Sequence, residues 1–210
     1  MPFRDRNEAA LRLAEHLAEY KGRNPLILAI PRGAVPMARI VADALDGEVD
    51  VVLVRKLRAP FSPEFAVGSV DESGWTYIAD YAARAGATPE YLETEKQAQL
   101  ETMRRRRTEY TPVRPPTDPA GRIVIVIDDG LATGSTMISA LHALRAKNPE
   151  KLICAVPVSP PDTLETVARY ADEVVCLETP AWFQAVGQFY TDFPQVEDSE
   201  VIAILRGKAE

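Results

Sequence analysis

Residues 124–136 constrain the fold of this chain more than any other stretch of its sequence. They read Val-Ile-Val-Ile-Asp-Asp-Gly-Leu-Ala-Thr-Gly-Ser-Thr. The four β-branched residues predict a strand that is buried on both faces, and the two carboxylates that follow predict its end. The helical spacing of Ile138, Leu141 and Leu144 predicts a helix soon afterwards. The connecting loop is therefore expected at the carboxyl edge of a sheet.

The predicted loop has the properties of an anion site. Gly134 allows the backbone to approach a ligand closely, and the unpaired amides of the first helical turn point toward the same place. The hydroxyl groups that add further donors belong to Thr133, Ser135 and Thr136. Asp128 and Asp129 carry the opposite charge, which suits sugar hydroxyls or a hydrated divalent cation. A phosphate site beside a carboxylate pair predicts a phosphorylated sugar as the ligand.

Three other interpretations of these residues fit less well. A P-loop requires Gly-Lys-Ser/Thr, and a haloacid-dehalogenase-type phosphatase requires Asp-x-Asp rather than two adjacent acids. Neither pattern occurs in residues 124–136. A capped helix whose acids merely face solvent would need no ligand. The apolar run, the acid pair and the loop nevertheless occur together in the order that a phosphate-sugar site requires, which favours the ligand site.

Residues 124–136 resemble the signature of the type I phosphoribosyltransferases, which is an apolar strand, two acids and a T-G-x-T loop. The resemblance implies that the chain binds phosphoribosyl pyrophosphate (PRPP), with the ribose hydroxyls on Asp128 and Asp129. The 5′-phosphate would then lie on the loop residues Ala132, Thr133, Gly134, Ser135 and Thr136. A Mg²⁺ cofactor is also implied, held by Asp128 and Asp129 through water or indirectly, and both acids would take part in catalysis.

A second strand-turn-helix unit contains Pro31-Arg32-Gly33-Ala34, between a predicted strand at 26–30 and a predicted helix at 35–45. It resembles the pyrophosphate loop of the same family. By that resemblance Arg32 would contact pyrophosphate, and Gly33 would permit close backbone approach. The family also implies a cis peptide bond between Pro31 and Arg32.

Basic residues follow a predicted strand at 51–54. Arg55 and Lys56 continue it as Val-Arg-Lys, which looks like the entrance to the catalytic loop of the orotate and adenine members of the family. Both side chains would then lie beside pyrophosphate, with Lys56 as a catalytic group. A basic loop in solvent is the alternative interpretation.

The candidate acid or base comes from a departure from the family pattern. The hypoxanthine-guanine members have an aspartate where this chain has Ala132, and alanine cannot exchange a proton. The loop instead resembles that of the adenine members, which use a glutamate from the region after the Val-Arg-Lys sequence. Glu72, or less favourably Asp71, is the matching carboxylate here. An ordinary turn would explain both residues equally simply.

Strands alternate with helices along the chain, which predicts an α/β fold with a doubly wound parallel sheet, in line with the type I phosphoribosyltransferase fold. We expect a single domain over residues 1–210. Within it, about 60–120 would form an insertion of loop, hairpin and helix, and about 179–210 a small C-terminal hood. In the insertion, Pro60 and Pro63 predict a loop at 61–64, residues 71–74 predict a hairpin turn, and Thr88-Pro89 predict the start of the helix.

Five aromatic residues gather in the hood: Trp182, Phe183, Phe189, Tyr190 and Phe193. They would either stack on a planar base, with Trp182 and Phe183 as the candidates, or pack as a satellite core.

The composition and charge of the chain limit the classes of partner that we expect it to bind. The net charge of −7 argues against a general nucleic-acid binder. No apolar run approaches the roughly 20 residues of a membrane span, and the N-terminus has no signal-peptide core, so we expect a cytoplasmic protein without a membrane partner. Cys154 and Cys176 are expected to be buried free thiols. The sequence leaves open whether the chain forms a homo-oligomer.

These features together predict a magnesium-dependent phosphoribosyltransferase, a glycosyltransferase of pentosyl groups that acts in nucleotide metabolism. It would move the 5-phosphoribosyl group from PRPP to a nitrogen nucleophile resembling a nucleobase, and release pyrophosphate. The alternative is a non-catalytic regulatory protein that binds PRPP. The sequence does not identify the small-molecule acceptor.

Overall fold

A computed structural model describes residues 2–207 and has a five-stranded parallel sheet at its centre, in the order β2-β1-β6-β7-β8. The predicted α/β fold with a parallel sheet is therefore confirmed. The strands of this sheet are β1 (Leu26–Ala29), β2 (Glu48–Val51), β6 (Ile123–Ile127), β7 (Lys151–Val158) and β8 (Glu173–Glu178). The main helices are α1 (Arg6–His16), α2 (Val35–Leu45), α4 (Ser135–Arg145), α5 (Pro161–Val167) and α6 (Asp198–Leu205).

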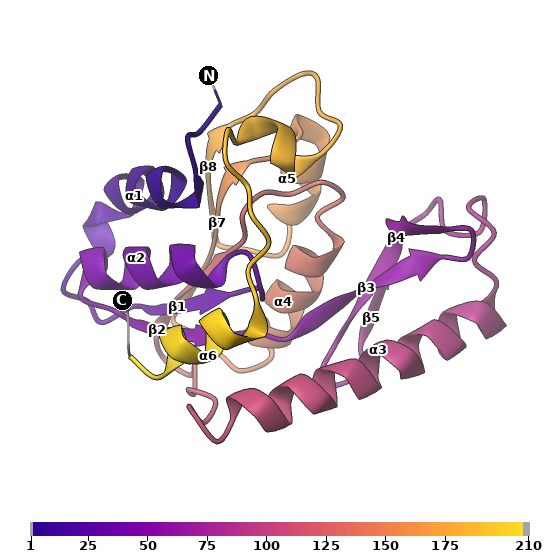
Figure 1. The fold of residues 1–210 in the computed structure, drawn as a ribbon, viewed down its shortest axis with the longest axis horizontal. Helices are drawn as coiled ribbons and strands as arrows, with labels where there is room; N and C mark the ends of the chain where they lie inside the picture. Colours follow the sequence, from indigo (N-terminus) through magenta and orange to yellow (C-terminus); the bar gives the residue numbers. More distant parts are fainter. Residues whose placement is uncertain (1, 208–210) are drawn as a thin grey trace.

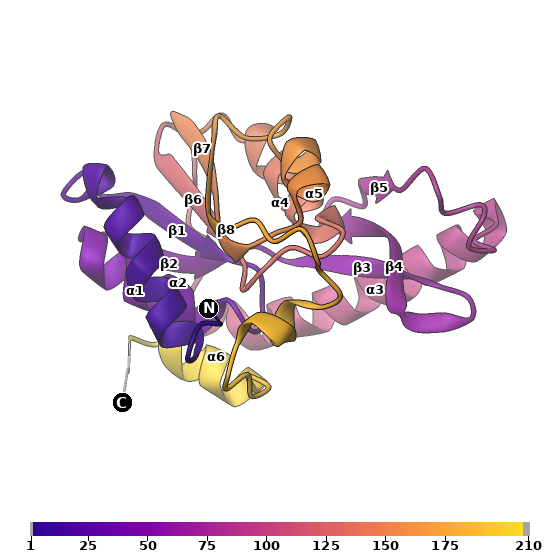
Figure 2. The same cartoon turned by 90° about the horizontal axis from the view of Figure 1, so that it is seen from above.

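Helices cover both faces of the sheet, as Figures 1 and 2 show. Successive side chains of a strand point to opposite faces, so each strand contributes to two cores. In β6, Ile123, Ile125 and Ile127 pack with α1 and α2, whereas Val124 and Val126 pack with α4. The apolar run of β6 is thus explained by burial on both faces, because all five of its residues are buried.

The order of the strands reverses direction between β1 and β6. From β1 the chain passes through α2 to β2 at one edge of the sheet, whereas β6 lies on the other side of β1 and continues outward to β7 and β8. Crossovers that diverge in this way leave a crevice at the carboxyl ends of the two central strands. The register pairs Ala29 with Ile127, so the loops after β1 and β6 begin side by side.

A second sheet stands apart from the central one and contains β3 (Val54–Ala59), β4 (Ser62–Asp71) and β5 (Thr76–Ile78), all antiparallel. The long helix α3 (Pro89–Tyr110) lies along it, and Figure 2 shows sheet and helix extending to one side of the main body. The predicted hairpin around 71–74 and the start of α3 at Thr88-Pro89 are confirmed, since the Thr88 hydroxyl caps the helix.

Two local predictions in this region are wrong. The strand predicted at 51–54 is divided, because β2 ends at Val51 and β3 begins at Val54. The loop predicted at 61–64 is the beginning of β4, since Ala59 pairs with Ser62 and the hairpin closes directly over two residues. Arg55 and Lys56 therefore lie within a strand and not in a loop, which fixes their backbone.

The segment before α1 lies beside the segment around Tyr190. Phe3 forms an isolated parallel bridge with Tyr190, and its amide donates to the Phe189 carbonyl at 2.7 Å. The Asp5 carboxylate caps α1 by accepting from the Glu8 amide at 2.8 Å, so Asp5 is the N-cap and Arg6 the first helical residue. The helix ends at His16 and continues as the 3₁₀ turn η1 (Ala18–Tyr20).

Two remaining expectations can be compared with residues 2–207. Cys154 is buried and Cys176 is half-buried, and both are free. Among the helices of these residues, none combines the length and the apolar character needed to cross a membrane.

Candidate functional site

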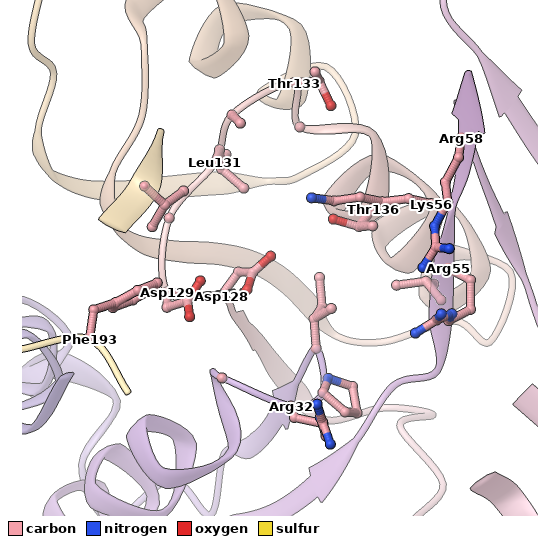
Figure 3. Close-up of a pocket in the computed structure, with 18 of the residues that line it drawn as sticks. Arg32, Arg55, Lys56, Arg58, Asp128, Asp129, Leu131, Thr133, Thr136 and Phe193 are labelled. Carbon is pink, nitrogen blue, oxygen red and sulfur yellow. Dashed lines mark hydrogen bonds between the residues drawn. The ribbon is translucent and has the colours of Figure 1, made fainter. Parts of the chain in front are cut away.

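A cavity of about 450 Å³ lies at the carboxyl ends of β1 and β6, where the reversal of strand order predicts a crevice. Five segments line it: the loop after β1, the loop after β6, strand β3, the beginning of β4 at Pro63 and the segment that follows β8. Figure 3 shows the acid pair on one side of this space and the basic side chains of β3 on the other. The cavity thus has an acidic and a basic side.

The acid pair ends β6 at the floor of the cavity. Asp128 accepts a hydrogen bond on Oδ1 from the amide of Asp129, at 2.9 Å. Burial raises the pKa of Asp128 well above its usual value, and the neighbouring charge of Asp129 raises this pKa further. Burial also raises the pKa of Asp129, but Arg6 opposes that rise because its positive charge favours the carboxylate. The two acids therefore have different electrostatic surroundings.

Arg6 belongs to the site, although its sequence context did not single it out. It is the first residue of α1, and its Nε and Nη2 donate to Asp129 Oδ2 at 3.1 and 2.9 Å. Its side chain is 10% exposed and that of Asp129 is 17% exposed, so solvent screens the pair weakly. A cation at a helix N-terminus is unfavourable for the helix dipole, and that was the one weak signal in the sequence.

The loop after β1 approaches the acid pair closely. A Cβ atom built on Gly33 would overlap Asp129 Oδ2, so any side chain at this position would have to displace Asp129. The peptide bond between Pro31 and Arg32 is cis, as the resemblance implied. Arg32 lines the cavity, but its guanidinium is directed away from the acids in Figure 3, and it lies 3.4 Å from Glu197 and 3.3 Å from Asp198.

The loop after β6 leads into α4 as predicted. Gly134 has φ +71° and precedes Ser135, the first residue of the helix. A Cβ on Gly134 would lie 2.8 Å from Val167, so glycine is required here by both conformation and space. The cavity is lined by Ala132, Thr133, Gly134 and Thr136. Ser135 is 2% exposed and lies outside that lining, and its hydroxyl is 3.0 Å from that of Thr133.

Strand β3 places three cations along the cavity: Arg55, Lys56 and Arg58. Arg55 donates to Gln99 Oε1 of α3 at 2.9 Å, which holds its guanidinium in place. Burial lowers the pKa of Arg55, and the positive charges of Arg106 and Arg58 lower it further. Lys56 is exposed, and Figure 3 shows it pointing from β3 into the cavity. This row of cations is suited to an anion bound at the basic side.

Besides Ser135, three of the predicted residues do not reach the cavity: Glu72, Trp182 and Phe183. Glu72 forms a bidentate ion pair with Arg107, at 2.9 and 2.5 Å. Trp182 is 90% exposed, and Phe183 stacks on Phe189, with the ring centroids 5.1 Å apart. The aromatic residue that lines the cavity is Phe193, together with the aliphatic Val186. Asp71, the less favoured acid, is buried and its Oδ1 accepts from the Ser73 and Trp75 amides.

The acid pair also fits a hydrated magnesium ion. Mg²⁺ is commonly held by one or two carboxylates together with phosphate oxygens of the substrate and water. Within residues 2–207 no group of three or more His, Cys, Asp or Glu side chains could hold a metal by itself. Asp128 and Asp129 both line the cavity, so they could hold such an ion jointly with a bound ligand.

Comparisons with known proteins agree with this geometry. A family model described as "Phosphoribosyl transferase domain" matches residues 5–194. A crystal structure of TT1426 from Thermus thermophilus has 45% sequence identity and a TM-score of 0.82, and covers 100% of both chains. A hypoxanthine-guanine phosphoribosyltransferase from Bacillus anthracis has 13% identity and a TM-score of 0.45, covering 85% of this chain and 79% of that one, which is too little to support an argument.

A protein of Mycobacterium tuberculosis H37Rv, whose name assigns it only provisionally as a phosphoribosyl transferase, is 41% identical over 204 residues. The match covers 97% of this chain and 46% of that protein, so this chain spans about half the length of its curated relative. Over nearly its whole length, this chain belongs to the phosphoribosyltransferase family and has the type I fold.

Proposed function

We propose that the protein transfers the 5-phosphoribosyl group of PRPP to a nitrogen nucleophile, such as a nucleobase-like molecule, and releases pyrophosphate. The observation that carries this proposal is the cavity itself, in which an acid pair, a phosphate-type loop and a row of cations face one space. A sugar that carries a monophosphate at one end and a pyrophosphate at the other matches that distribution of charge.

The donor would bind across the cavity. Its 5′-phosphate would lie on the amides at the start of α4, where the helix N-terminus favours an anion. The ribose hydroxyls would donate to Asp128 and Asp129, since carboxylates are acceptors only. The pyrophosphate would lie toward Lys56 and Arg55 on β3 and toward Arg32, which would have to leave Glu197 and Asp198 to reach it.

In the chemical step, a lone pair of the acceptor nitrogen forms the bond to the anomeric carbon while the bond from that carbon to the pyrophosphate oxygen breaks. The electron pair of the broken bond stays on pyrophosphate, and a proton carried by the acceptor nitrogen would pass to solvent. Arg32, Lys56 and Arg55 would stabilise that growing negative charge, and a preorganised donor of this kind contributes about 3 kcal/mol to the transition state. A Mg²⁺ ion, when bound, would neutralise pyrophosphate oxygens further.

A PRPP-binding regulator remains the second candidate, and one observation favours it. Glu72 is engaged by Arg107, and the carboxylates that line the described cavity are those of the acid pair alone. A regulator would bind PRPP with Mg²⁺ but would release no pyrophosphate with any acceptor.

Calorimetry and a pyrophosphate-release assay separate these two candidates. We expect the protein to bind PRPP with Mg²⁺, and to release pyrophosphate in the presence of at least one compound from a panel of purines, pyrimidines and small amines. Asp128→Asn and Asp129→Asn should abolish donor binding, whereas Arg12→Gln, on the same helix as Arg6 but paired with Glu178, should not. Wild-type protein that binds no PRPP would refute both candidates.

A further inference from the structure

Arg6, the first residue of α1, connects this helix to the acid pair after β6. We propose that Arg6 is a positioning residue for the donor, because it holds the Asp129 carboxylate in the orientation that receives a ribose hydroxyl. This inference rests on the proposed function, since it concerns the way in which PRPP binds.

The hydrogen bonds of the acid pair leave one oxygen of each carboxylate free. Arg6 donates from two nitrogens to a single atom, Asp129 Oδ2. The backbone amide of Asp129 occupies Asp128 Oδ1. Within the part of the chain that the structure describes, no hydrogen bond is formed by Asp129 Oδ1 or Asp128 Oδ2. Two free acceptors on adjacent residues match the two neighbouring hydroxyl groups of a ribose.

Contacts with the C-terminal segment fix the guanidinium itself. Arg6 Nη1 donates to the Pro194 carbonyl at 2.6 Å, and the Arg6 Cζ atom lies 3.8 Å from the centroid of the Phe193 ring. All three nitrogens of the guanidinium are thereby used. An arginine fork held in this way loses little further freedom when it orients a carboxylate.

Asp129 is held at its backbone as well as at its side chain. The Tyr190 hydroxyl donates to the Asp129 carbonyl oxygen at 2.6 Å. Tyr190 stacks on Phe193, with the ring centroids 4.7 Å apart, and so belongs to the same group of contacts as Arg6. The backbone is therefore fixed without Arg6, and the specific task left to Arg6 is the side-chain orientation of Asp129.

Arg12 provides a matched control on the same helix. Like Arg6, it pairs with a carboxylate, Glu178, at 3.1 Å, and lies over an aromatic ring, Phe3, at 4.8 Å. Neither arginine lines the cavity itself, but the partner of Arg6, Asp129, does, whereas the partner of Arg12, Glu178, does not. Arg12→Gln thus removes an ion pair, although a more exposed one, and a stacking contact without touching the acid pair.

The test measures the binding of three ligands by calorimetry, each with Mg²⁺: PRPP, ribose 5-phosphate and inorganic pyrophosphate. In Arg6→Gln we expect the Kd of PRPP and of ribose 5-phosphate to rise at least about tenfold, because a charge-assisted contact to the ribose-binding carboxylate is lost. Pyrophosphate has no ribose, so its Kd should stay within about twofold. Arg6→Lys should recover part of the loss, and Arg12→Gln should bind all three ligands like the wild type.

The binding stoichiometry distinguishes positioning from a purely structural role. A destabilised protein would bind fewer ligands per chain at an unchanged Kd, whereas a misplaced carboxylate raises Kd at an unchanged stoichiometry. If Arg6→Gln does not fold, Arg6→Lys decides, with a rise of at least about threefold in the PRPP Kd supporting the proposal.

Several results would overturn the inference. Wild-type affinity for PRPP in Arg6→Gln, or tighter binding, would show that Arg6 does not orient Asp129 for the donor. An equal loss for pyrophosphate would show a general effect of charge. In both cases the wild type still binds PRPP, so the proposed function stands, whereas a wild type that binds no PRPP would refute that function and this inference together.

Discussion

Gly33 and Asp129 are so close that a Cβ on Gly33 would overlap Asp129 Oδ2 and lie 3.0 Å from Arg6 Nη2. The requirement for glycine in the loop after β1 therefore comes from the protein itself. From the sequence, Gly33 was expected only to allow the approach of pyrophosphate. The contact couples the two loops that form the crevice.

Gly33→Ala should weaken PRPP binding by about tenfold or more, because the new methyl group displaces Asp129 and the charge-assisted bond to Arg6. Calorimetry measures the loss of PRPP affinity. A double-mutant cycle with Asp129→Asn, measured in the free energy of unfolding, tests whether the contact with Asp129 is the one disturbed. The two substitutions share one contact, so their effects on the free energy of unfolding should not add. Additive effects would show that Gly33 acts independently of Asp129.

Asp128→Asn should raise the thermal stability of the ligand-free protein at neutral pH. Burial raises the pKa of Asp128, so its ionised form is disfavoured in the folded state. A gain of about 1 kcal/mol corresponds to a rise in Tm of about 2–4 °C for a chain of this size. Asp172→Asn is the contrasting variant, because its ion pair with Arg145 lowers the pKa of Asp172 and its substitution should lower Tm.

The gain from Asp128→Asn should depend on pH. The pKa of this group is raised in the folded state, so its destabilising effect is absent below the pKa of the unfolded chain, about 4, and grows as the pH rises above it. Scanning calorimetry from pH 4 to neutral pH should show a difference in Tm that begins small and increases. A constant difference across this range would contradict the pKa shift as its cause.

Glu72→Gln separates the two interpretations of that residue. A catalytic role requires a loss in rate of about 100-fold or more. The ion pair with Arg107 leads us to expect instead a rate within about threefold of the wild type, together with a lower Tm, because Arg107 would lose its carboxylate partner. Pyrophosphate release and thermal unfolding measure the two effects, and a rate loss without a change in Tm would favour catalysis.

Glu197→Gln combined with Asp198→Asn should strengthen the binding of pyrophosphate by about threefold or more, because an exposed ion pair that must be broken contributes up to about 1 kcal/mol. Both carboxylates pair with Arg32 at the start of α6. Asp198 also accepts from the Tyr110 hydroxyl at 2.6 Å, so Tyr110→Phe is the control for that second contact. Unchanged pyrophosphate affinity in the double variant would show that the ion pairs with Glu197 and Asp198 do not keep Arg32 from reaching pyrophosphate.

The sequence predicted the features that depend on local pattern. The strand at 123–127, the acid pair after it and the glycine before α4 follow from periodicity and backbone conformation, which neighbouring residues determine. Arg6 could not be found in this way, and Tyr190 and Phe193 could be noticed only as members of an aromatic stretch, because their roles depend on contacts between distant parts of the chain. Asp129, which Arg6 and Tyr190 both contact, lies far from these two residues in sequence.

The error at 61–64 has a similar origin. Pro60 and Pro63 suggested a loop, but a proline is tolerated where a strand has no partner on its N–H side. The structure pairs β5 with Gly68–Val70 of β4, so Pro63 lies beyond the reach of β5, at a section of β4 that is flanked by β3 alone. Which strands lie next to Pro63 depends on the tertiary structure, so the sequence around the proline does not predict it.

The bridge between Phe3 and Tyr190 joins the segment before α1 to the segment after β8, and Tyr190 in turn holds Asp129; this arrangement has a consequence for the order of folding. The central strands can pair once β6 and β7 have been synthesised, whereas Tyr190, Phe193 and Pro194 emerge from the ribosome later. Contacts between residues far apart in sequence also form late because the entropy of closing so large a loop opposes them. The carboxylate that would bind the ribose is therefore expected to gain its final setting only after the rest of the sheet is in place.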